Sequence, residues 1–347
     1  MKINLTQNKN FKLFKIISKV AQENNQTVYI VGGYVRDLLM QRKAPTDIDF
    51  VTEQSGIELA KAVGKELGDL KVSVFKTYGT AMIKYKDLDL EFVGARKESY
   101  SEDSRKPAVE TGTLEDDQKR RDFTVNALAI SLNAENFGEL IDPFNGREDM
   151  QNKILRTPLE PAQTYSDDPL RMMRAIRFAS VLHFEIEKNS LEAIKQEAER
   201  IKIVSMERIM VEFNKIMLSE KPSVGLKLME ETTLLEKIIP ELTALRGIEE
   251  VEGQTHKDNF WHTLEVVDNI SKNTDNLWLR WAALLHDIGK APTKKFVEKI
   301  GWTFHGHEFL GSKMVKNLFT RLKLPLGPDM KYVQKMVKLS SRPIALI

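Results

Sequence analysis

The pattern of apolar residues changes near residue 165, and this change constrains the fold more than any other feature of the chain. Before it, short runs of strand-like residues alternate with segments of helical periodicity. After it, strand patterns fade and apolar residues recur at helical spacing. We therefore predict an α+β fold class, with a head made of a small mixed sheet and helices, followed by an all-α remainder.

The expected elements and domains can be stated by residue range. The predicted strands are Thr27–Val31, Ile48–Val51, Val72–Phe75, Thr80–Tyr85 and Leu88–Val93, and the predicted helices with apolar stripes are Ile57–Leu67, Leu170–Leu182, Met206–Leu218 and Val224–Leu235. The charged segment Glu98–Arg121 is predicted to be a mobile surface loop that leads into a helix. Prolines and glycines at two breaks predict three domains, 1–165, 166–248 and 249–347.

Composition excludes several classes of protein. With 41% hydrophobic and 29% charged residues among 347, the chain is typical of globular proteins. Its net charge of +2 gives no global basic field, so we expect no DNA partner, and any nucleic-acid surface must be local. The absence of cysteine excludes a disulfide scaffold, a thiolate zinc site and a cysteine nucleophile. No apolar stretch is long enough to span a membrane, so we expect a soluble cytoplasmic protein.

A strand end runs through Gly32 and Gly33 into a helix that carries Arg36. Backbone amides at such a turn can face an anion, and Arg36 lies one turn further on, so the segment is a candidate triphosphate cradle. The alternative is a tight turn that needs glycine only for backbone freedom.

Acidic residues alternate with apolar ones in two predicted strands. Asp47 and Asp49 share one strand face, while Ile48 and Phe50 point to the core. Two adjacent carboxylates repel unless a cation lies between them, and oxygen-only ligands suit Mg²⁺. Glu91 repeats the alternation in a second strand and is the candidate third catalytic carboxylate. The alternative is an ordinary exposed strand face.

Two further segments carry polar side chains at helical spacing. The segment from Arg120 is predicted to begin a helix, with Asp122 and Asn126 one turn apart on one face. A second helix carries an arginine stripe of Arg171, Arg174 and Arg177. Both patterns also occur on solvated surfaces, but an arginine stripe beside a cleft can bind phosphate.

Five motifs occur in an order that resembles one family. These are GGYVRD, TDIDFV, EDDQKRRDFTVNALAI, IDPFNGREDM and DDPLRMMRAIRFAS, within residues 25 to 240. They resemble the class II tRNA nucleotidyltransferases, which are the bacterial CCA-adding enzymes of the polymerase-β-like superfamily. Bacterial poly(A) polymerases share much of this pattern, but their basic Gly-Arg-Arg-Phe stretch is absent and Phe75–Ala81 resembles the CCA-adding type.

The resemblance implies a nucleotidyltransferase head, followed by a helical neck and body for nucleotide selection and RNA binding. It implies that Asp47 and Asp49 hold Mg²⁺ and that the incoming nucleotide is bound by Gly32, Gly33, Arg36, Arg121, Asp122, Asn126, Asp168, Arg171, Arg174 and Arg177. The segment Met206–Glu212 resembles the last helical motif of the family, for which we expect a structural role.

The last third of the chain carries a second group of metal-ligating residues. His262, His286 and Asp287, with His305 and His307 further on, resemble an HD phosphohydrolase domain, in which histidine and aspartate bind a divalent metal. We predict a second metal site at His262, His286, Asp287 and His307, occupied by a transition metal. The domain is expected to be incomplete, because the segment 338–343 has serines where such sequences place another histidine and no late aspartate follows.

These observations predict a template-independent enzyme that adds C, A or both to the tRNA 3′ end from CTP and ATP and releases pyrophosphate by two-metal catalysis. Two alternatives remain open. The first is a poly(A) polymerase, which performs the same chemistry on another RNA. The second is an HD-type phosphohydrolase whose head only senses nucleotides.

Asp168 and Arg171 offer a way to select the base without a nucleic-acid template. They stand three residues apart at a helix start, with Pro169 expected at the first helical position. Cytosine and adenine present an amino donor beside an unprotonated ring nitrogen, whereas uracil and guanine present the opposite pattern. A carboxylate only accepts and a guanidinium only donates, so this pair would favour C and A.

Overall fold

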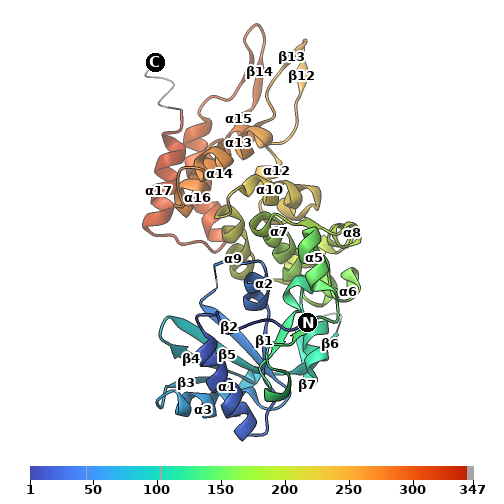
Figure 1. The fold of residues 1–347 in the computed structure, drawn as a ribbon. Helices are drawn as coiled ribbons and strands as arrows, with labels where there is room; N and C mark the ends of the chain where they lie inside the picture. The colour runs from blue at the N-terminus through green and yellow to red at the C-terminus, as the bar shows by residue number, and fades with distance from the viewer. Residues whose placement is uncertain (44, 102–103, 342–347) are drawn as a thin grey trace. The chain divides into compact units, whose positions relative to one another are not determined.

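A seven-stranded sheet organises the first of two units, Met1–Asp167, in a computed structural model that describes residues 1–43, 45–101 and 104–341. The strand order is β3-β4-β5-β2-β1-β8-β9 (Figure 1). These strands are β1 (Tyr29–Val31), β2 (Asp47–Thr52), β3 (Val72–Phe75), β4 (Thr80–Tyr85), β5 (Leu88–Gly94), β8 (Ala129–Ser131) and β9 (Leu140–Ile141). Strands β2 and β5 run parallel, and the other neighbours in this sheet are antiparallel. The five predicted strands are confirmed.

Alternation of side chains in β2 and β5 separates large apolar residues on one face of the sheet from acidic residues on the other. Ile48 and Phe50 of β2 are buried with Phe92 of β5 in a core covered by helices α1 (Phe11–Glu23) and α3 (Gly56–Glu66). The rings of Phe50 and Phe92 stack with centroids 5.0 Å apart. Since successive residues of a strand point to opposite sides, the acidic residues of β2 and β5 lie on the other face.

The charged segment 98–121 is not a loop, which corrects the sequence prediction. It forms β6 (Arg96–Ser101) and β7 (Ser104–Thr111), which pair antiparallel, followed by α4 (Leu114–Lys119). The backbone pairs here although the sequence has no apolar alternation to signal strands. Helix α4 ends with Arg120 as its C-cap, so the prediction of a helix beginning at Arg120 is also wrong. Residues Thr124–Asn126 form only a short 3-10 turn.

The remaining elements of the first unit are short. They are α2 (Gly33–Leu39), α5 (Gly146–Asn152), β10 (Ile154–Leu155), α6 (Pro161–Asp167) and a 3-10 turn at each of Lys76–Tyr78 and Ala134–Asn136. Helix α2 follows β1 directly, as the Gly-Gly pair predicts. The unit ends at Asp167, close to the end of the predicted domain 1–165.

The second unit, Asp168–Ile347, is mostly helical, as predicted. Its helices are α7 (Leu170–Leu182), α8 (Lys188–Glu197), α9 (Met206–Met217), α10 (Pro222–Glu231), α11 (Leu234–Ile238), α12 (Pro240–Thr243), α13 (Asn259–Ser271), α14 (Leu277–Leu285), α15 (Lys290–Thr293), α16 (His307–Arg321) and α17 (Pro328–Lys338), with a 3-10 segment at Ala198–Ile203. Its short strands are β11 (Glu185–Ile186), β12 (Glu250–Val251), β13 (Gln254–Thr255), β14 (Lys295–Val297) and β15 (Gly301–Thr303). The predicted division of this region at 248/249 stays a prediction.

The helical predictions for the second unit hold with one exception. Helix α7 has the predicted bounds, and α9 ends one residue earlier than predicted. The predicted helix Val224–Leu235 is two helices, α10 and α11. Thr233 has a φ of 62°, a left-handed conformation that interrupts the helical hydrogen-bond ladder.

A buried arginine links the helices of the second unit. Arg280 of α14 is 1% exposed, and its guanidinium donates to the carbonyl oxygens of Met217 (2.7 Å), Ser219 (2.8 Å), Ser271 (3.1 Å) and Thr274 (2.9 Å). The end of α9 is thereby joined to α13 and α14. Among the described residues, no helix combines the length and the apolar character that crossing a lipid bilayer demands.

Candidate active site and HD-like site

Three carboxylates lie together on the polar face of the sheet in the first unit. The parallel pairing of β2 and β5 places Asp49 directly opposite Glu91, and Asp47 lies two residues before Asp49 on the same face. Asp89, opposite Asp47, is neutralised by Lys84, whose Nζ donates to Asp89 Oδ2 at 3.0 Å. Within the described residues, the side chains of Asp47, Asp49 and Glu91 form no ion pair or hydrogen bond. The alternation predicted for both strands is confirmed.

The environment of Asp49 and Glu91 disfavours their charged forms. Burial raises the pKa of Asp49, and the Asp47 charge adds to the rise, while Arg121 opposes it. Burial also raises the pKa of Glu91, and the charges of Asp49 and Asp47 add to the rise, with Arg96 in opposition. Asp49 and Glu91 are half-buried and Asp47 is exposed. Unpartnered carboxylates that repel each other are the chemistry expected of a site for a hard divalent cation.

Gly32 brings the glycine turn against this site. Its φ of 74° is a conformation that favours glycine, and a Cβ at this position would lie 3.0 Å from Arg121 Nη1 and 3.4 Å from Asp49 Oδ2. A side chain at position 32 would therefore both strain the turn and displace the arginine. The turn thus needs glycine for conformation and for close approach.

Arg121 is held beside Asp49 by a carboxylate that the sequence analysis did not single out. Asp117 of α4 is fully buried and accepts from Arg121 Nε at 2.9 Å, while Arg121 Nη2 lies 2.8 Å from the same oxygen. Arg120 forms a short ion pair with the other oxygen of Asp117. Although burial acts to raise the pKa of Asp117, the two guanidinium groups hold it below its usual range. The only sequence signal was its spacing, three and four residues before two arginines.

A second network joins Arg36 to the turn that follows α4. Arg36 Nη1 donates to Asn126 Oδ1 at 2.7 Å, and Asn126 Nδ2 donates to Asp122 Oδ1 at 3.0 Å. Arg36 also donates from Nε to Asp37 Oδ1 at 2.9 Å and from Nη2 to Asp37 Oδ2 at 3.0 Å. Asp122 and Asn126 do face each other as predicted, although they are not on a regular helix. Gly33 begins α2. Nucleotide binding by Gly32, Gly33, Arg36, Arg121, Asp122 and Asn126 stays a prediction.

The predicted base-selecting residues lie at the start of α7 in the second unit. Pro169 is the N-cap rather than the first helical residue, but its φ of −61° and ψ of −17° are already helical. Asp168 accepts at Oδ1 from the backbone N–H of Leu170 at 3.3 Å, and its Oδ2 lies 3.9 Å from Arg208 Nη2 of α9. The backbone N–H of Arg171 donates to the Asp168 carbonyl oxygen at 2.9 Å.

The other two arginines of the predicted stripe pack on one aromatic ring. The guanidinium carbons of Arg174 and Arg177 lie 5.5 and 3.9 Å from the centre of the Phe178 ring. Arg177 Nε also lies 2.7 Å from Glu212 Oε2, a buried carboxylate of α9. This contact supports the structural role expected for the segment Met206–Glu212. Nucleotide binding by Arg174 and Arg177 stays a prediction.

His262, His286 and Asp287 form a separate cluster in the second unit. Their ligand atoms lie within 4.8 Å of one another, and in the described part of the chain they are the one group of three metal-ligating residues that meets this limit. The oxygens of Asp47, Asp49 and Glu91 are more widely spaced. His307 Nε2 lies 3.5 Å from Asp287 Oδ1, so this residue adjoins the cluster, whereas His305 is exposed outside it.

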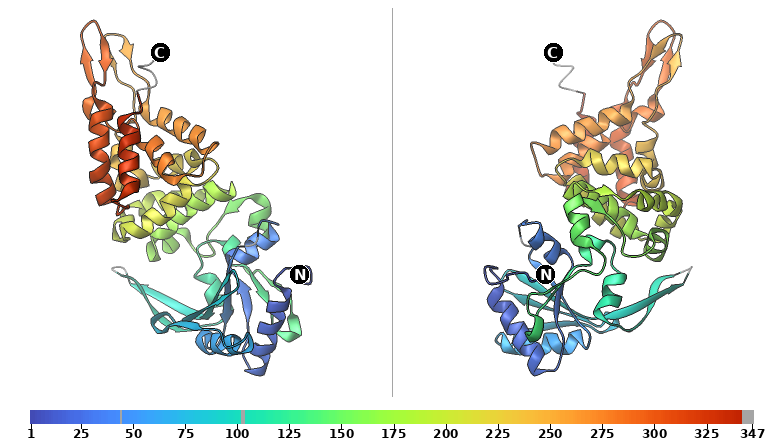
Figure 2. Two further views of the ribbon diagram at one scale, coloured as in Figure 1. Left: turned by 90° about the vertical axis from the view of Figure 1, so that its left-hand side faces the viewer. Right: turned by 45° about the vertical axis from the view of Figure 1, so that its right-hand side comes forward.

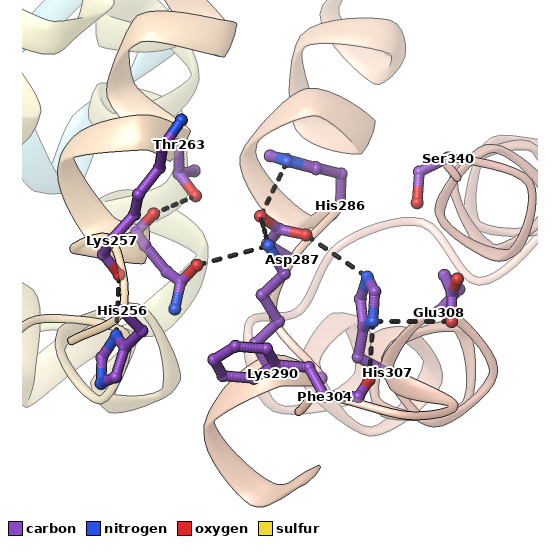
Figure 3. Close-up of polar contacts among 12 residues, drawn as sticks. His256, Lys257, Thr263, His286, Asp287, Lys290, Phe304, His307, Glu308 and Ser340 are labelled. Atoms are coloured by element: carbon purple, nitrogen blue, oxygen red, sulfur yellow. Dashed lines mark hydrogen bonds and ion pairs between the residues drawn. The ribbon is translucent and has the colours of Figure 1, made fainter. Parts of the chain in front are cut away.

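Hydrogen bonds orient His286 and His307, whose rings both face Asp287 (Figure 3). His286 Nδ1 bonds the Ala283 carbonyl oxygen at 2.8 Å and His307 Nδ1 bonds that of Phe304 at 2.9 Å. A neutral imidazole that donates from Nδ1 presents a bare lone pair at Nε2. His286 Nε2 lies 3.1 Å from Asp287 Oδ2, so two lone pairs face each other unless a proton or a metal ion lies between them.

Charges around the cluster keep Asp287 ionised. Burial acts to raise the pKa of Asp287, but the hydrogen bond and charge of His286, with Lys290, lower it to about 2. Lys290 Nζ donates to Asp287 Oδ2 at 2.7 Å and to Asn259 Oδ1 at 3.3 Å. Burial, followed by the charge of His286, lowers the pKa of His262, which favours its neutral, metal-binding form.

Comparisons with known proteins agree with the assignment of a nucleotidyltransferase head in the first unit and an HD-like domain in the second. Three family models match: "Poly A polymerase head domain" at residues 28–156, "Probable RNA and SrmB- binding site of polymerase A" at 183–245 and "HD domain" at 259–345. A "Multifunctional CCA protein" of Shewanella frigidimarina is 32% identical over 311 residues, which cover 86% of this chain and 70% of that protein. An "A-adding tRNA nucleotidyltransferase" of Aquifex aeolicus is 34% identical over 301 residues, covering 82% of this chain and 34% of that protein.

A solved structure extends the similarity over nearly the whole chain. "Structure of tRNA-processing enzyme with CTP" superimposes with a TM-score of 0.62 at 30% identity, covering 95% of this chain and 90% of that one. The chain therefore belongs to the family of class II tRNA nucleotidyltransferases and bacterial poly(A) polymerases, and the predicted polymerase-β-like head and HD-like domain are confirmed. It spans about a third of the Aquifex protein and less than two thirds of the length of six further curated relatives.

The buried position of Asp117 predicts a large effect on stability. Replacing it by asparagine leaves Arg120 and Arg121 without their shared counter-charge, and we expect a loss of about 3 kcal/mol in the free energy of unfolding at pH 7. Glu115→Gln on the same helix is the matched control, because the Glu115–Lys119 pair is exposed, and it should cost under about 0.5 kcal/mol. Urea unfolding followed by circular dichroism measures both changes.

The difference in the free energy of unfolding between wild type and Asp117→Asn should depend on pH in one direction. The pKa of Asp117 is lowered from 3.8, so its contribution is complete above that value and disappears as the pH falls through the lower folded-state pKa. The gap between wild type and Asp117→Asn should be constant from pH 7 to about 5 and narrow below about 4. A gap no larger than that of the control at pH 7 would contradict the assigned role of Asp117.

Proposed function

We propose that this protein is a template-independent tRNA nucleotidyltransferase that adds C and A to the 3′ end of cytoplasmic tRNA from CTP and ATP. The observation that carries the proposal is the in-register pairing of Asp49 with Glu91, with Asp47 beside them and Arg121 held next to Asp49. The names of the family members, which include CCA-adding and A-adding enzymes, support tRNA as the substrate.

The three carboxylates fit Mg²⁺ because they are unpartnered oxygen ligands on one face of the sheet. Asp47 and Asp49 would hold the ion, with Glu91 as the third carboxylate. When bound, it would lower the pKa of the attacking hydroxyl and neutralise charge on the phosphate oxygens.

The reaction is a single displacement at phosphorus. The 3′-oxygen of the tRNA forms a bond to the α-phosphorus, the bond from that phosphorus to the bridging oxygen of the β-phosphate breaks, and the hydroxyl proton passes to solvent. Pyrophosphate leaves, and no covalent enzyme intermediate forms. Arg36 and Arg121 are oriented before substrate arrives, Arg36 by Asn126 and Arg121 by Asp117, and guanidinium groups suit phosphate oxygens.

We further propose that Asp168 and Arg171 select the base. Asp168 would accept from the exocyclic amino group of cytosine or adenine, and Arg171 would donate to the adjacent ring nitrogen. With uracil or guanine both contacts fail. Each mispaired buried polar group costs about 1–3 kcal/mol, and each 1.4 kcal/mol is about tenfold, so two failures give selection of several orders of magnitude.

The first test is nucleotide addition to a tRNA that lacks its CCA end. The purified protein with Mg²⁺ should add C and then A and stop, as sequencing of the products would show, whereas unlimited extension with ATP alone would identify a poly(A) polymerase. Asp49→Ala should reduce incorporation by at least about 100-fold, since several kcal/mol of charge stabilisation is lost. Asp89→Ala is the matched control, because Lys84 already neutralises that residue. Near wild-type activity in Asp49→Ala would refute the proposal.

The second test concerns selection of the base. Asp168→Ala and Arg171→Ala should each lower the use of CTP and ATP and increase incorporation of UTP relative to CTP by about tenfold or more. The relative kcat/KM values for the four nucleotides measure this. Wild-type preference and rate in both variants would exclude this pair as the selecting element.

The second cluster favours a second site of different chemistry. We propose that His262, His286 and Asp287, with His307 adjoining, hold a divalent transition metal, because imidazole and carboxylate ligands converge there.

Calorimetric titration of metal-free protein with Mn²⁺ or Ni²⁺ should show one site that Asp49→Ala retains and that His286→Ala weakens by about 100-fold. His305→Ala is the matched control. Equal metal affinity in His286→Ala and wild type would contradict a metal site at this cluster. Hydrolysis of phosphomonoesters or cyclic phosphodiesters that depends on His286 and not on Asp49 would support the phosphohydrolase alternative.

A further inference from the structure

Five exposed lysines surround the solvent side of the seam between α16 and α17. We call this group the lysine face, and its members are Lys313, Lys316, Lys331, Lys335 and Lys338. The two helices pack against each other (Figure 2), and Gln334 Nε2 donates to the Ser312 carbonyl oxygen at 3.2 Å across the seam. Residues three and four apart share a helix side, so the three lysines of α17 lie on one side of that helix and the two of α16 on one side of theirs. Lys338 of α17 and Lys313 of α16 both approach the ring of Phe309, which brings the two sides together.

The local charge of this region differs from that of the whole chain. Residues 307 to 341 contain seven basic and two acidic residues, although the complete chain is nearly balanced at +2. One of the two acids, Glu308, forms a short hydrogen bond with Ser341, and the other, Asp329, lies in the first turn of α17. The lysine face is therefore a concentrated positive patch.

The lysines of this face have no acidic partner anywhere in the described structure, whereas several other surface lysines form ion pairs. Lys19 pairs with Glu66 at 3.1 Å, Lys61 with Glu58 at 2.9 Å and Lys294 with Glu249 at 2.6 Å. None of the five lysines of the face forms an ion pair within the residues that the structure describes. Like charges at helical i,i+3 and i,i+4 spacing destabilise a helix, so this arrangement favours an external polyanion.

An exposed aromatic ring completes the surface. Phe309 of α16 is 55% exposed, with Lys313 Nζ 4.1 Å and Lys338 Nζ 6.0 Å from its ring centre. These contacts link ammonium groups of the two helices around one ring. Lys331, Lys335 and Lys338 span about 10 Å along α17, since an α-helix rises 1.5 Å per residue. A nucleic-acid duplex carries about one phosphate charge per 1.7 Å of axis, so several phosphates fit this length.

We infer that the lysine face binds the phosphate backbone of a base-paired part of the tRNA. This inference rests on the proposed function for the identity of the RNA. The face supplies affinity for the body of the substrate, and it takes no part in nucleotide chemistry. Because it acts through phosphates, it binds without regard to base sequence and weakens with rising salt.

The test is a triple variant, Lys316→Gln, Lys331→Gln and Lys335→Gln, measured by fluorescence anisotropy with tRNA that lacks its CCA end. Glutamine keeps the helix propensity of lysine and its introduction removes like-charge repulsion, so the melting temperature should not fall. We expect about tenfold weaker binding at moderate salt, and a log–log salt slope reduced by two to three, since each lost phosphate contact lowers it by about one. Nucleotide addition should show a raised KM for tRNA with unchanged kcat.

The matched control is Lys19→Gln, Lys61→Gln and Lys294→Gln, which removes the same charge from ion-paired positions. It should leave the affinity and the salt slope within about twofold of wild type. Equal loss in both triple variants, or none in the first, would overturn the inference. So would a first variant that loses binding only to vesicles of phosphatidylserine and phosphatidylcholine, since the partner would then be a lipid surface. A wild-type protein that binds tRNA through this face but adds no nucleotide would refute the proposed function and leave the face established.

Discussion

The parallel pairing of β2 with β5 is the constraint on which the candidate active site depends. It places Asp49 opposite Glu91, although these residues lie 42 positions apart in the chain. The same register stacks Phe50 on Phe92 on the other face, under α1 and α3. A shift of one residue between the strands would separate both pairs at once, because side chains alternate between the faces. The apolar core therefore fixes the spacing of the carboxylates.

The alternating strands and the apolar helices could be predicted from the sequence because burial imposes their periodicity. The sequence placed Asp47 and Asp49 on one face and assigned Glu91 to a second strand, and the structure confirms both placements. It did not signal β6 and β7, because their charged residues lack the apolar alternation that identifies a half-buried strand. The break at Thr233 was missed for a related reason. A single left-handed residue leaves the apolar pattern on both sides intact.

Asp117 illustrates what local pattern cannot predict. In the sequence it is one of several acids in a charged segment, and charged residues are usually solvated. Its burial results from the packing of α4, and only then does its carboxylate become the shared partner of Arg120 and Arg121. The link from Arg36 to Asn126 is similar, because it joins residues 90 positions apart. Such contacts depend on the tertiary fold and have no periodic signature.

Arg280 has a consequence for how the helical half of the molecule loses its structure. Its guanidinium donates hydrogen bonds to carbonyl oxygens at the end of α9, at the end of α13 and in the turn before α14. Separating the helices before residue 248 from those after it would remove the Met217 and Ser219 carbonyl oxygens from this guanidinium, which would keep its contacts with Ser271 and Thr274. It would also expose the buried rings of Phe213 and Trp281, whose centres lie 5.1 Å apart across the same boundary. The two groups of helices should therefore melt in one cooperative transition. A protease cut near residue 250 should leave two fragments that stay associated until that transition.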